Sequence, residues 1–428
     1  VWGGGIYESD IFYDICDRLG ICVWQDFPFA CSAYPAYDEE YMANVKKEAE
    51  DNVKRLRHHA CLALFCGNNE IEQIKGCITD NIDEGGMTWD EYKKLFDELL
   101  PGVVRKHAPY ISYWPSSPHT PENRKDYNSP YSGDAHLWGV WHGREPFEWY
   151  RQCEHRFNSE FGFQSFPSPE IVEGYTSPGD RNISSYIMEY HQRSPIGNDA
   201  IIQYMLSWFR LPSKFNMQLY LSQILQGEAM RYAVEHWRRS MPRGMGTLYW
   251  QINDCWPGPS WSSIDYKGNW KALHYIAGKF YAPVLVSGVE DAKTGTVEIY
   301  VNNDFLNDIS GTVTWKLYCT DGSIIAYGRF PVTVRANSVQ KVNVLDLKKW
   351  LSEAGERNIL LYIKYMGNNG IDSENTVIFV RPKHLELKKP EFCIKVEKES
   401  DNKFGILLSS RVPALWVWAD GFKAKAEY

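Results

Sequence analysis

The chain has 428 residues, which is enough for two to three domains of ordinary size. Lys and Arg number 46 and Asp and Glu number 54, so the net charge is −8. This mild acidity argues against nucleic acid as a partner, because a phosphate backbone attracts a basic surface. No run approaches the ~18 consecutive apolar residues that cross a membrane, and the 44% hydrophobic content suits a globular core. The composition therefore indicates a multidomain globular protein whose partner is neither nucleic acid nor a membrane.

Short apolar runs alternate with amphipathic stretches over the first 283 residues. The apolar runs predict six buried strands, near residues 21, 61, 111, 136, 156 and 247. The spacing of apolar residues predicts helices over 8–20, 38–56, 88–107, 217–239 and 269–281, with a long irregular stretch after Glu160. Buried strands that alternate with helices are typical of an α/β domain with a parallel sheet. A (β/α)8 barrel would need two more strands, and Val1-Trp2 reads as the tail of one of them.

The pattern changes at about residue 284. From 284 to 382, apolar residues alternate with polar ones in runs that turn sequences such as Asp321-Gly322 separate, and this predicts an antiparallel β-sandwich of immunoglobulin type. Residues 383–428 begin another β module, too short for a sandwich of ~100 residues. We therefore predict three domains, 1–283, 284–382 and 383–428, and we expect that the chain begins inside the barrel and ends inside a second sandwich.

Ten cysteines are present, without a CxxC pair and without the Cys/His spacing of a zinc site. Most lie in apolar runs, as Cys61 and Cys66 do, which predicts buried free thiols and no metal. The first residues include neither an initiator Met nor a signal peptide, so cytoplasmic, periplasmic, lysosomal and secreted locations all stay open. The oligomeric state is open as well.

Two glutamates follow apolar strands. Glu70 ends the run Leu-Ala-Leu-Phe-Cys-Gly-Asn-Asn-Glu, and Glu160 ends Arg-Phe-Asn-Ser-Glu. The C-terminal ends of barrel strands face the active site, and a pair of carboxylates there is what glycoside hydrolysis requires. A single glutamate after a strand is more often a solvated loop residue. By spacing alone, the functional and the structural interpretations are about equally supported.

Six segments resemble glycoside hydrolase family two, and most closely its beta-mannosidases. They are 1–8 (VWGGGIYE), 23–35 (VWQDFPFACSAYP), 64–70 (LFCGNNE), 133–141 (GDAHLWGVW), 157–162 (FNSEFG) and 247–257 (TLYWQINDCWP). They occur in the family's order, and the segment 23–35 is the one most particular to beta-mannosidases. Beyond about residue 285 the resemblance concerns the architecture only.

The resemblance implies a retaining hydrolase that uses no cofactor. Glu70 would be the general acid/base after the fourth barrel strand, and Glu160 the nucleophile after the seventh. Retention requires carboxyl groups ~5–5.5 Å apart, with Glu160 ionised and Glu70 protonated. The resemblance also implies that the first strand, most of the second and the N-terminal β domains of the same protein are missing from this chain.

The substrate implied is terminal, non-reducing β-D-mannose in manno-oligosaccharides or N-glycan cores, which an exo-acting enzyme would release. One alternative is a family-two enzyme for another sugar, such as galactose, glucuronate or glucosamine. A second is a non-catalytic carbohydrate-binding relative, which the intact motifs at Glu70 and Glu160 disfavour.

Five further residues are candidates for sugar contacts. Asn69 is expected to hydrogen-bond the sugar 2-hydroxyl. Trp2 and Trp250 stand at strand ends and would form apolar walls, although core packing is the usual role of tryptophan. A histidine at position 136 would contact sugar hydroxyls or tune the nucleophile, while a structural histidine is about as common. Trp138 is the fifth candidate, because relatives often carry an aromatic residue in this segment.

Overall fold

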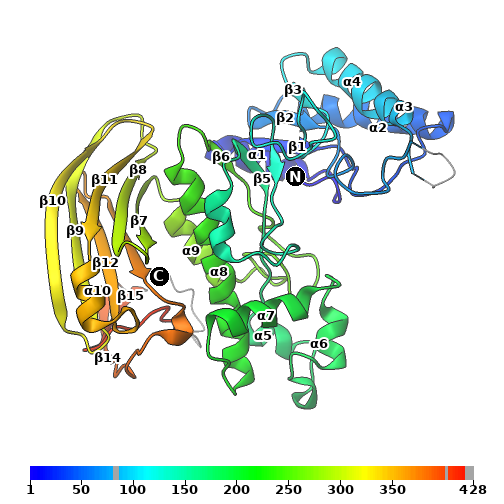
Figure 1. Cartoon of the computed structure of the whole chain (residues 1–428). Coiled ribbons are helices and arrows are strands. Elements are labelled where there is room, and N and C mark those ends of the chain that lie inside the picture. Colours follow the sequence, from blue (N-terminus) through cyan, green and yellow to red (C-terminus); the bar gives the residue numbers. More distant parts are fainter. Residues whose placement is uncertain (81–85, 401–402, 420–428) are drawn as a thin grey trace. The chain divides into compact units, whose positions relative to one another are not determined.

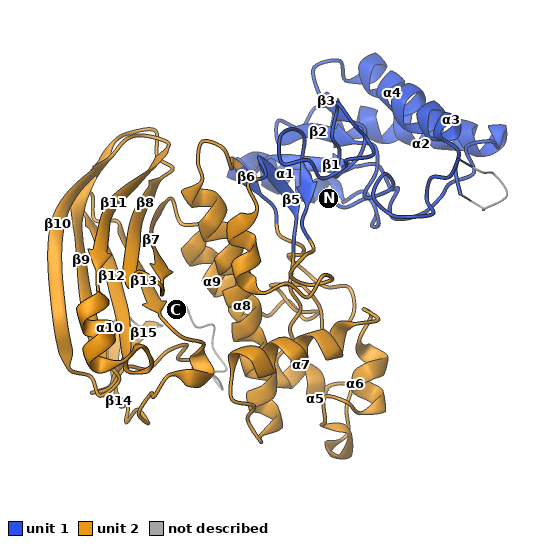
Figure 2. Cartoon of the chain, in the orientation of Figure 1, with its two compact units in different colours: residues 1–137, 155–161, 246–248 blue, residues 138–154, 162–245, 249–428 orange. Residues whose placement is uncertain are grey.

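The computed structural model describes residues 1–80, 86–400 and 403–419 (Figure 1). The chain forms two compact units, coloured separately in Figure 2. The first unit comprises Val1–Leu137, His155–Phe161 and Gly246–Leu248, and the second comprises Trp138–Glu154, Gly162–Met245 and Tyr249–Tyr428. Among the described helices, none combines the length and the apolar character that crossing a membrane demands.

The first unit holds two three-stranded parallel sheets (Figure 1). One sheet has the order β1-β2-β3, formed by Val23–Asp26, Leu62–Cys66 and Ser112–Trp114. The other has the order β4-β5-β6, formed by Ala135–His136, Phe157–Glu160 and Gly246–Thr247. All six predicted strands are present, and the predicted α/β class with parallel pairing is confirmed. A closed (β/α)8 barrel stays a prediction, because the described strand pairs form two separate sheets.

Helices cover the first sheet as amphipathic spacing predicts. Helix α1 (Asp10–Leu19) ends at Gly20, whose φ of 68° lies in the left-handed region that glycine tolerates. Helix α2 (Glu39–Leu56) begins where the Asp38 side chain accepts two backbone N–H groups. The predicted helix 88–107 is divided into α3 (Trp89–Tyr92), a π-helical turn (Lys93–Leu99) and α4 (Leu100–His107). The apolar faces of these helices and of the sheet form one core, which includes Val53, Phe65, Leu95 and Val103.

The second unit begins with helices. The predicted helices 217–239 and 269–281 are present as α8 (Phe215–Arg239) and α9 (Ala272–Phe280). The stretch after Glu160 that we expected to be irregular contains three more helices, α5 (Pro169–Glu173), α6 (Tyr186–His191) and α7 (Gly197–Trp208). That expectation was wrong for α7 above all, whose Ile201, Met205 and Trp208 recur at helical spacing and are buried.

The β-sandwich is also present in the second unit (Figure 1). Its two antiparallel sheets have the orders β11-β8-β7 and β10-β9-β12-β13. The strands are Val284–Asp291, Thr296–Asn303, Ile309–Cys319, Ile324–Val334, Ser338–Asp346, Ile359–Gly367 and Asp372–Ile378, numbered β7 to β13 in chain order. Their inward-facing apolar side chains form a separate core, and the short helix α10 (Lys348–Ala354) packs at its edge.

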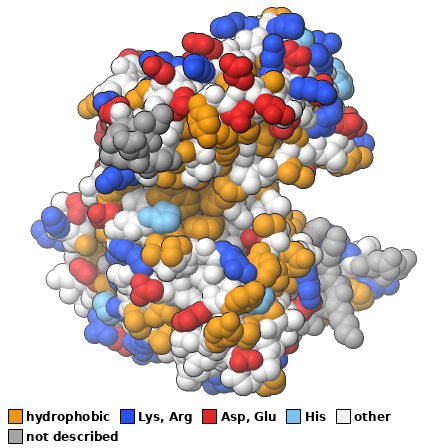
Figure 3. All heavy atoms as spheres, turned by 90° about the vertical axis from the view of Figure 1, so that its right-hand side faces the viewer, with side chains coloured by type: hydrophobic (Ala, Val, Ile, Leu, Met, Phe, Trp, Pro, Cys, Tyr) orange, Lys and Arg blue, Asp and Glu red, His pale blue; other side chains and the backbone are white. Residues whose placement is uncertain are grey.

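A hairpin follows the sandwich, formed by β14 (Cys393–Ser400) and β15 (Lys403–Ser409). Residues 401–402 and 420–428 of the predicted third domain lie outside the described residues. The three-domain division at residues 283 and 382 stays a prediction. On the face that Figure 3 shows, acidic and basic side chains are interspersed, so the mild net charge is not gathered in one patch there.

Candidate active site

The loop after β2 carries Glu70 in a conformation that several contacts enforce. A Cβ on Gly67 would lie 2.3 Å from the Pro115 carbonyl oxygen, so this close approach of two loops requires glycine. Asn68 is fully buried, and its Oδ1 accepts from the Ile71 backbone N–H (3.1 Å) and from the Ser116 hydroxyl (2.9 Å). Glu70 itself has a φ of +61°, a left-handed backbone that a non-glycine residue rarely adopts. Strain of this kind is typical of functional positions, where the surroundings hold it in place.

The side chain of Glu70 faces a buried histidine. Its Oε1 lies 2.8 Å from His136 Nδ1 and accepts a hydrogen bond from Gln73 Nε2 at 3.3 Å. Cys31 Sγ lies 3.7 Å from the other carboxylate oxygen, and burial, together with the charge of Glu70, raises the pKa of this thiol to about 12. The thiol is therefore a neutral donor to Glu70 rather than a nucleophile. Sequence reasoning missed Cys31, because this cysteine was not singled out from the other free thiols; the residue as a whole is exposed, although its thiol is partly desolvated beside Glu70.

Glu160 approaches the same histidine from β5. It is the last residue of that strand, and its backbone carbonyl accepts from Leu137 N–H at 2.8 Å. Glu160 Oε2 lies 3.7 Å from His136 Nδ1. One carboxylate oxygen of Glu70, one of Glu160 and one ring nitrogen of His136 all lie within 4.8 Å of one another. The strand ends thus bring together three residues that the sequence places 66 and 24 positions apart.

Asn69 joins the cluster through its amide. The orientation that satisfies both neighbours has the nitrogen donate to Glu160 Oε2 at 3.3 Å and the oxygen accept from Trp2 Nε1 at 3.2 Å. Trp2 is 39% exposed. Of the predicted sugar-contact residues, Asn69 therefore lies beside Glu160 and Trp2 lies beside Asn69.

The surroundings of His136 favour its cationic form. Burial by itself would lower its pKa, but the charges of Glu160 and Glu70 and the hydrogen bond to Glu70 outweigh burial and raise the pKa to about 9. Its Nε2 lies 2.8 Å from the Ser117 hydroxyl. Both ring nitrogens are thus in hydrogen bonds, and an imidazolium lies between two acidic side chains.

The spacing of these three side chains would also suit a bound cation. A histidine coordinates a metal through an unprotonated nitrogen, whereas the charges around His136 favour its protonated form as long as no ion is bound. We therefore interpret the cluster as an acid–base site and keep the prediction that no metal is used. Asp14, Asp17 and His59 form a second group of similar spacing, in which His59 Nδ1 lies 2.7 Å from Asp17 Oδ2.

Asp134 accepts hydrogen bonds from residues around the site, among them Ser117, which contacts His136. Its Oδ1 accepts from Trp114 Nε1 (2.9 Å) and from the His119 backbone N–H (3.0 Å). Its Oδ2 accepts from the hydroxyls of Ser117 (2.6 Å) and Ser159 (2.5 Å). Four donors converge on one buried carboxylate, as its ionised form requires. Ser117 had no signal in the sequence, because it lies in a loop beyond the strand that ends at Trp114.

The remaining two candidates, Trp138 and Trp250, belong to the second unit. A Cβ on Gly162 would lie 2.4 Å from the Trp250 carbonyl oxygen and 2.9 Å from the Trp138 ring, so glycine allows these segments to pack. Trp138 also contacts the ring of Trp261, with 6.1 Å between ring centroids. The two tryptophans therefore lie close together in the second unit, and their predicted contacts with sugar stay predictions.

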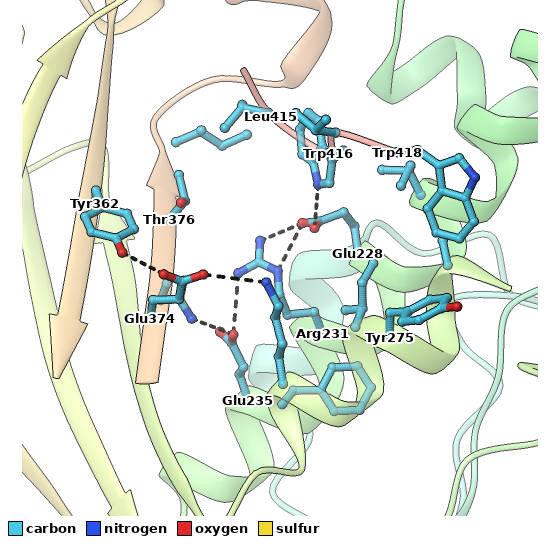
Figure 4. Close-up of a pocket in the computed structure, with 18 of the residues that line it drawn as sticks. Glu228, Arg231, Glu235, Tyr275, Tyr362, Glu374, Thr376, Leu415, Trp416 and Trp418 are labelled. Atoms are coloured by element: carbon cyan, nitrogen blue, oxygen red, sulfur yellow. Dashed lines mark hydrogen bonds and ion pairs between the residues drawn. The ribbon is translucent and has the colours of Figure 1, made fainter. Parts of the chain in front are cut away.

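A cavity of about 350 Å³ lies in the second unit (Figure 4). Its charged side chains bond to one another: Arg231 contacts Glu228 at 2.6 Å, and Trp416 Nε1 donates to Glu228 at 3.0 Å. On the opposite wall the Tyr362 hydroxyl donates to Glu374 at 2.6 Å. We interpret this cavity as structural.

Comparison with known proteins bears on the whole chain. A family model described as "Mannosidase Ig/CBM-like domain" matches residues 295–384. The chain is 30% identical to "Beta-mannosidase B" of Aspergillus clavatus over 96% of this chain and 51% of that protein. It is 33% identical to "Beta-mannosidase B" of Emericella nidulans over 81% of this chain and 44% of that protein. The chain thus spans about half the length of the curated relatives it matches.

Solved structures show the same similarity. A beta-D-mannosidase of Dictyoglomus thermophilum superimposes with a TM-score of 0.88 at 34% identity, over 97% of this chain and 50% of that one. An exo-chitosanase of Amycolatopsis orientalis superimposes with a TM-score of 0.72 at 15% identity, over 95% of this chain and 51% of that one, a likeness that concerns the fold alone. Over the half of these proteins that it spans, the chain is thus similar to beta-mannosidases in sequence and in fold.

Proposed function

We propose that the protein is a retaining exo-beta-mannosidase that hydrolyses terminal, non-reducing β-D-mannose through a covalent glycosyl-enzyme intermediate. The observation that carries this proposal is the cluster of Glu70, Glu160 and His136, whose facing polar atoms lie within 4.8 Å of one another. Inverting enzymes hold their carboxyl groups ~6.5–9.5 Å apart to leave room for a water molecule, whereas retaining enzymes need ~5–5.5 Å. The compact pair favours retention.

The two glutamates take different roles in this proposal. Glu160 attacks the anomeric carbon while Glu70 protonates the departing oxygen, and the first step leaves a mannosyl ester on Glu160. In the second step Glu70 accepts a proton from the water molecule that cleaves the ester. In this proposal Asn69, which bonds to Glu160 Oε2, would also bond to the sugar 2-hydroxyl, and the partly exposed Trp2 would pack against the apolar face of the sugar.

We further propose that β1 to β6 belong to a (β/α)8 barrel. Parallel strands place their carboxyl ends at one edge, and this explains why β2 and β5, which belong to different sheets, direct Glu70 and Glu160 to one histidine. The names of the relatives support mannose as the sugar. The natural substrates in this proposal are manno-oligosaccharides or N-glycan cores.

The test is a panel of p-nitrophenyl β-glycosides with the full-length protein. We expect hydrolysis of the β-mannoside and, by proton NMR during the reaction, β-mannose as the first product. Preference for the β-galactoside, β-glucuronide or β-glucosaminide would assign the protein to another family-two specificity. Formation of α-mannose would contradict retention, and binding of mannosides without turnover would indicate a carbohydrate-binding relative.

A further inference from the structure

A short chain of hydrogen bonds leads from Asp134 to Glu70. The Ser117 hydroxyl lies 2.6 Å from Asp134 Oδ2 and 2.8 Å from His136 Nε2, and His136 Nδ1 lies 2.8 Å from Glu70 Oε1. Ser117 and Asp134 are 4% exposed and His136 is 3% exposed. Water is therefore kept away from the side-chain contacts that set the protonation of the histidine.

The positions of the protons in this chain follow from which groups can donate a hydrogen bond and which can only accept one. Asp134 accepts four hydrogen bonds, so the single hydroxyl proton of Ser117 points toward that carboxylate. The oxygen of Ser117 then accepts from His136, which means that Nε2 carries a proton. Nδ1 is left facing Glu70, and the proton between these two atoms is the one whose position can change.

Acidic groups surround this histidine from several elements. Glu70 faces it from the loop after β2, Glu160 from the end of β5 and Asp134 from the segment before β4, while Asp26 at the end of β1 interacts with its charge over a longer distance. Together they outweigh burial and raise the pKa of His136 to about 9. At neutral pH the free protein therefore holds its mobile proton on the imidazole, beside two carboxylates that would otherwise repel each other.

We propose that His136 holds the catalytic proton of the free enzyme on Nδ1 and delivers it to Glu70, and that Ser117 and Asp134 are positioning residues that keep the second ring proton on Nε2. This inference deepens the proposed function and rests on it. It gives His136 a role in proton transfer, where sequence reasoning offered a sugar contact or a structural role.

Over one catalytic turnover the proton leaves His136 Nδ1 and is returned to it. When substrate displaces water, the Nδ1–H bond breaks and an O–H bond forms on Glu70, which leaves a neutral imidazole whose remaining proton bonds to Ser117. Glu70 then gives this proton to the glycosidic oxygen as the C–O bond breaks and Glu160 forms the ester. In the second step Glu70 removes a proton from water and returns it to Nδ1.

The Ser117→Ala variant tests the positioning role through the pH profile of kcat/KM. The imidazolium loses an acceptor for its Nε2–H, so its pKa falls, and we expect the alkaline limb of the profile to move to lower pH by about one unit. Asp134→Asn should move the limb in the same direction. The control is Ser132→Ala, whose hydroxyl bonds to Glu122 and not to His136. A uniform loss of activity at every pH, with the alkaline limb unmoved in Ser117→Ala, would overturn the positioning role.

A second measurement needs neither substrate nor a variant of Ser117 that folds. In full-length protein labelled with ¹⁵N-histidine, the ring signals of His136, assigned by their loss in His136→Gln, should show both nitrogens protonated at pH 7. Nδ1 should lose its proton near pH 9 while Nε2 keeps its own. A neutral ring at pH 7, or loss of the Nε2 proton first, would overturn the inference. Because no glycoside is present, this result is independent of whether the sugar preference proposed above is right.

Discussion

The strands of the first unit and those of the β-sandwich bury different kinds of side chain. Strands β1 to β6 are two to five residues long, and their ends bury polar residues such as Asp26, His136 and Glu160. Strands β7 to β13 are seven to eleven residues long and bury mainly Val, Ile and Leu, as Val297 and Ile299 illustrate. Short strands with buried charged side chains are thus found in the first unit, whereas the sandwich has longer strands around an apolar core.

Under the proposed function, this difference assigns the chemistry to the first unit and leaves the sandwich a structural role. A buried polar group is costly unless it is hydrogen-bonded. In the first unit His136 bonds to Glu70 and to Ser117, and Ser117 bonds in turn to Asp134. Removing one member of such a network leaves its partners unsatisfied and also removes a chemical function. Removing an apolar side chain of the sandwich opens a cavity and should leave the chemistry unchanged.

The largest effect is expected for Glu160→Ala in the full-length protein. No other group is placed to form the ester, so turnover should fall by at least about 10⁴-fold. A 2-fluoro mannosyl inactivator should label Glu160 of the unaltered protein, which peptide mass spectrometry would locate. A label on any other residue would contradict the assignment of the nucleophile.

Glu70→Ala should cost less, and the cost should depend on the substrate. General acid catalysis contributes ~10²–10⁴-fold, so substrates with poor leaving groups should be hydrolysed that much more slowly, while the first step with activated aryl mannosides is spared. Azide should restore turnover and give β-mannosyl azide, detected by NMR. If azide neither rescues activity nor yields that product, Glu70 is not the acid/base.

Ile299→Ala tests whether the sandwich contributes to stability without taking part in the reaction. The side chain is fully buried between the two sheets, so its truncation should lower the free energy of unfolding by about 2–5 kcal/mol, measured by urea denaturation. kcat should stay within a few-fold of the unaltered protein. A loss of kcat as large as that of Glu70→Ala, in a folded variant, would show that the sandwich takes part in the chemistry.

The pH dependence of stability should come from the first unit. The pKa of His136 is raised from 6.5 to about 9, so its contribution to stability is fully present below pH 6.5 and is lost as the pH rises through about 9. The loss should amount to roughly 3 kcal/mol, because each pKa unit corresponds to about 1.4 kcal/mol. In His136→Gln this fall between pH 6.5 and 9 should disappear. An equal fall in that variant would assign the pH dependence to other groups.

Asn69→Ala should have the smallest effect of these changes. The loss of one hydrogen bond to a charged or charge-developing partner costs about 1.5–3 kcal/mol, which corresponds to a ten- to hundredfold lower kcat/KM. The variant should no longer distinguish p-nitrophenyl β-mannoside from its 2-deoxy analogue as strongly as the unaltered protein does. Unchanged discrimination would place the 2-hydroxyl contact elsewhere.

Elements with a strong local pattern could be predicted from the sequence by itself. Helix α2 has a capping Asp38 and an unbroken apolar stripe, and the strands of the sandwich alternate between inward and outward residues. Helix α7 was missed because it begins at Gly197, close after Pro195, without a side-chain cap. Those residues indicate a loop, and only packing against α8 and its neighbours decides otherwise.

The candidate site divides in the same way. Glu70 and Glu160 could be named from the sequence, because each lies at or shortly after the end of an apolar strand, within a segment that resembles the family. Ser117, Cys31 and the relay through His136 could not, since they lie in loops or beside strands that carry no local signal of a shared site. Their partners are 17 to 66 residues away along the chain, and the tertiary fold brings them within hydrogen-bond distance. A local pattern determines which element a residue belongs to, whereas the charge and protonation of a buried side chain depend on neighbours that only the tertiary structure supplies.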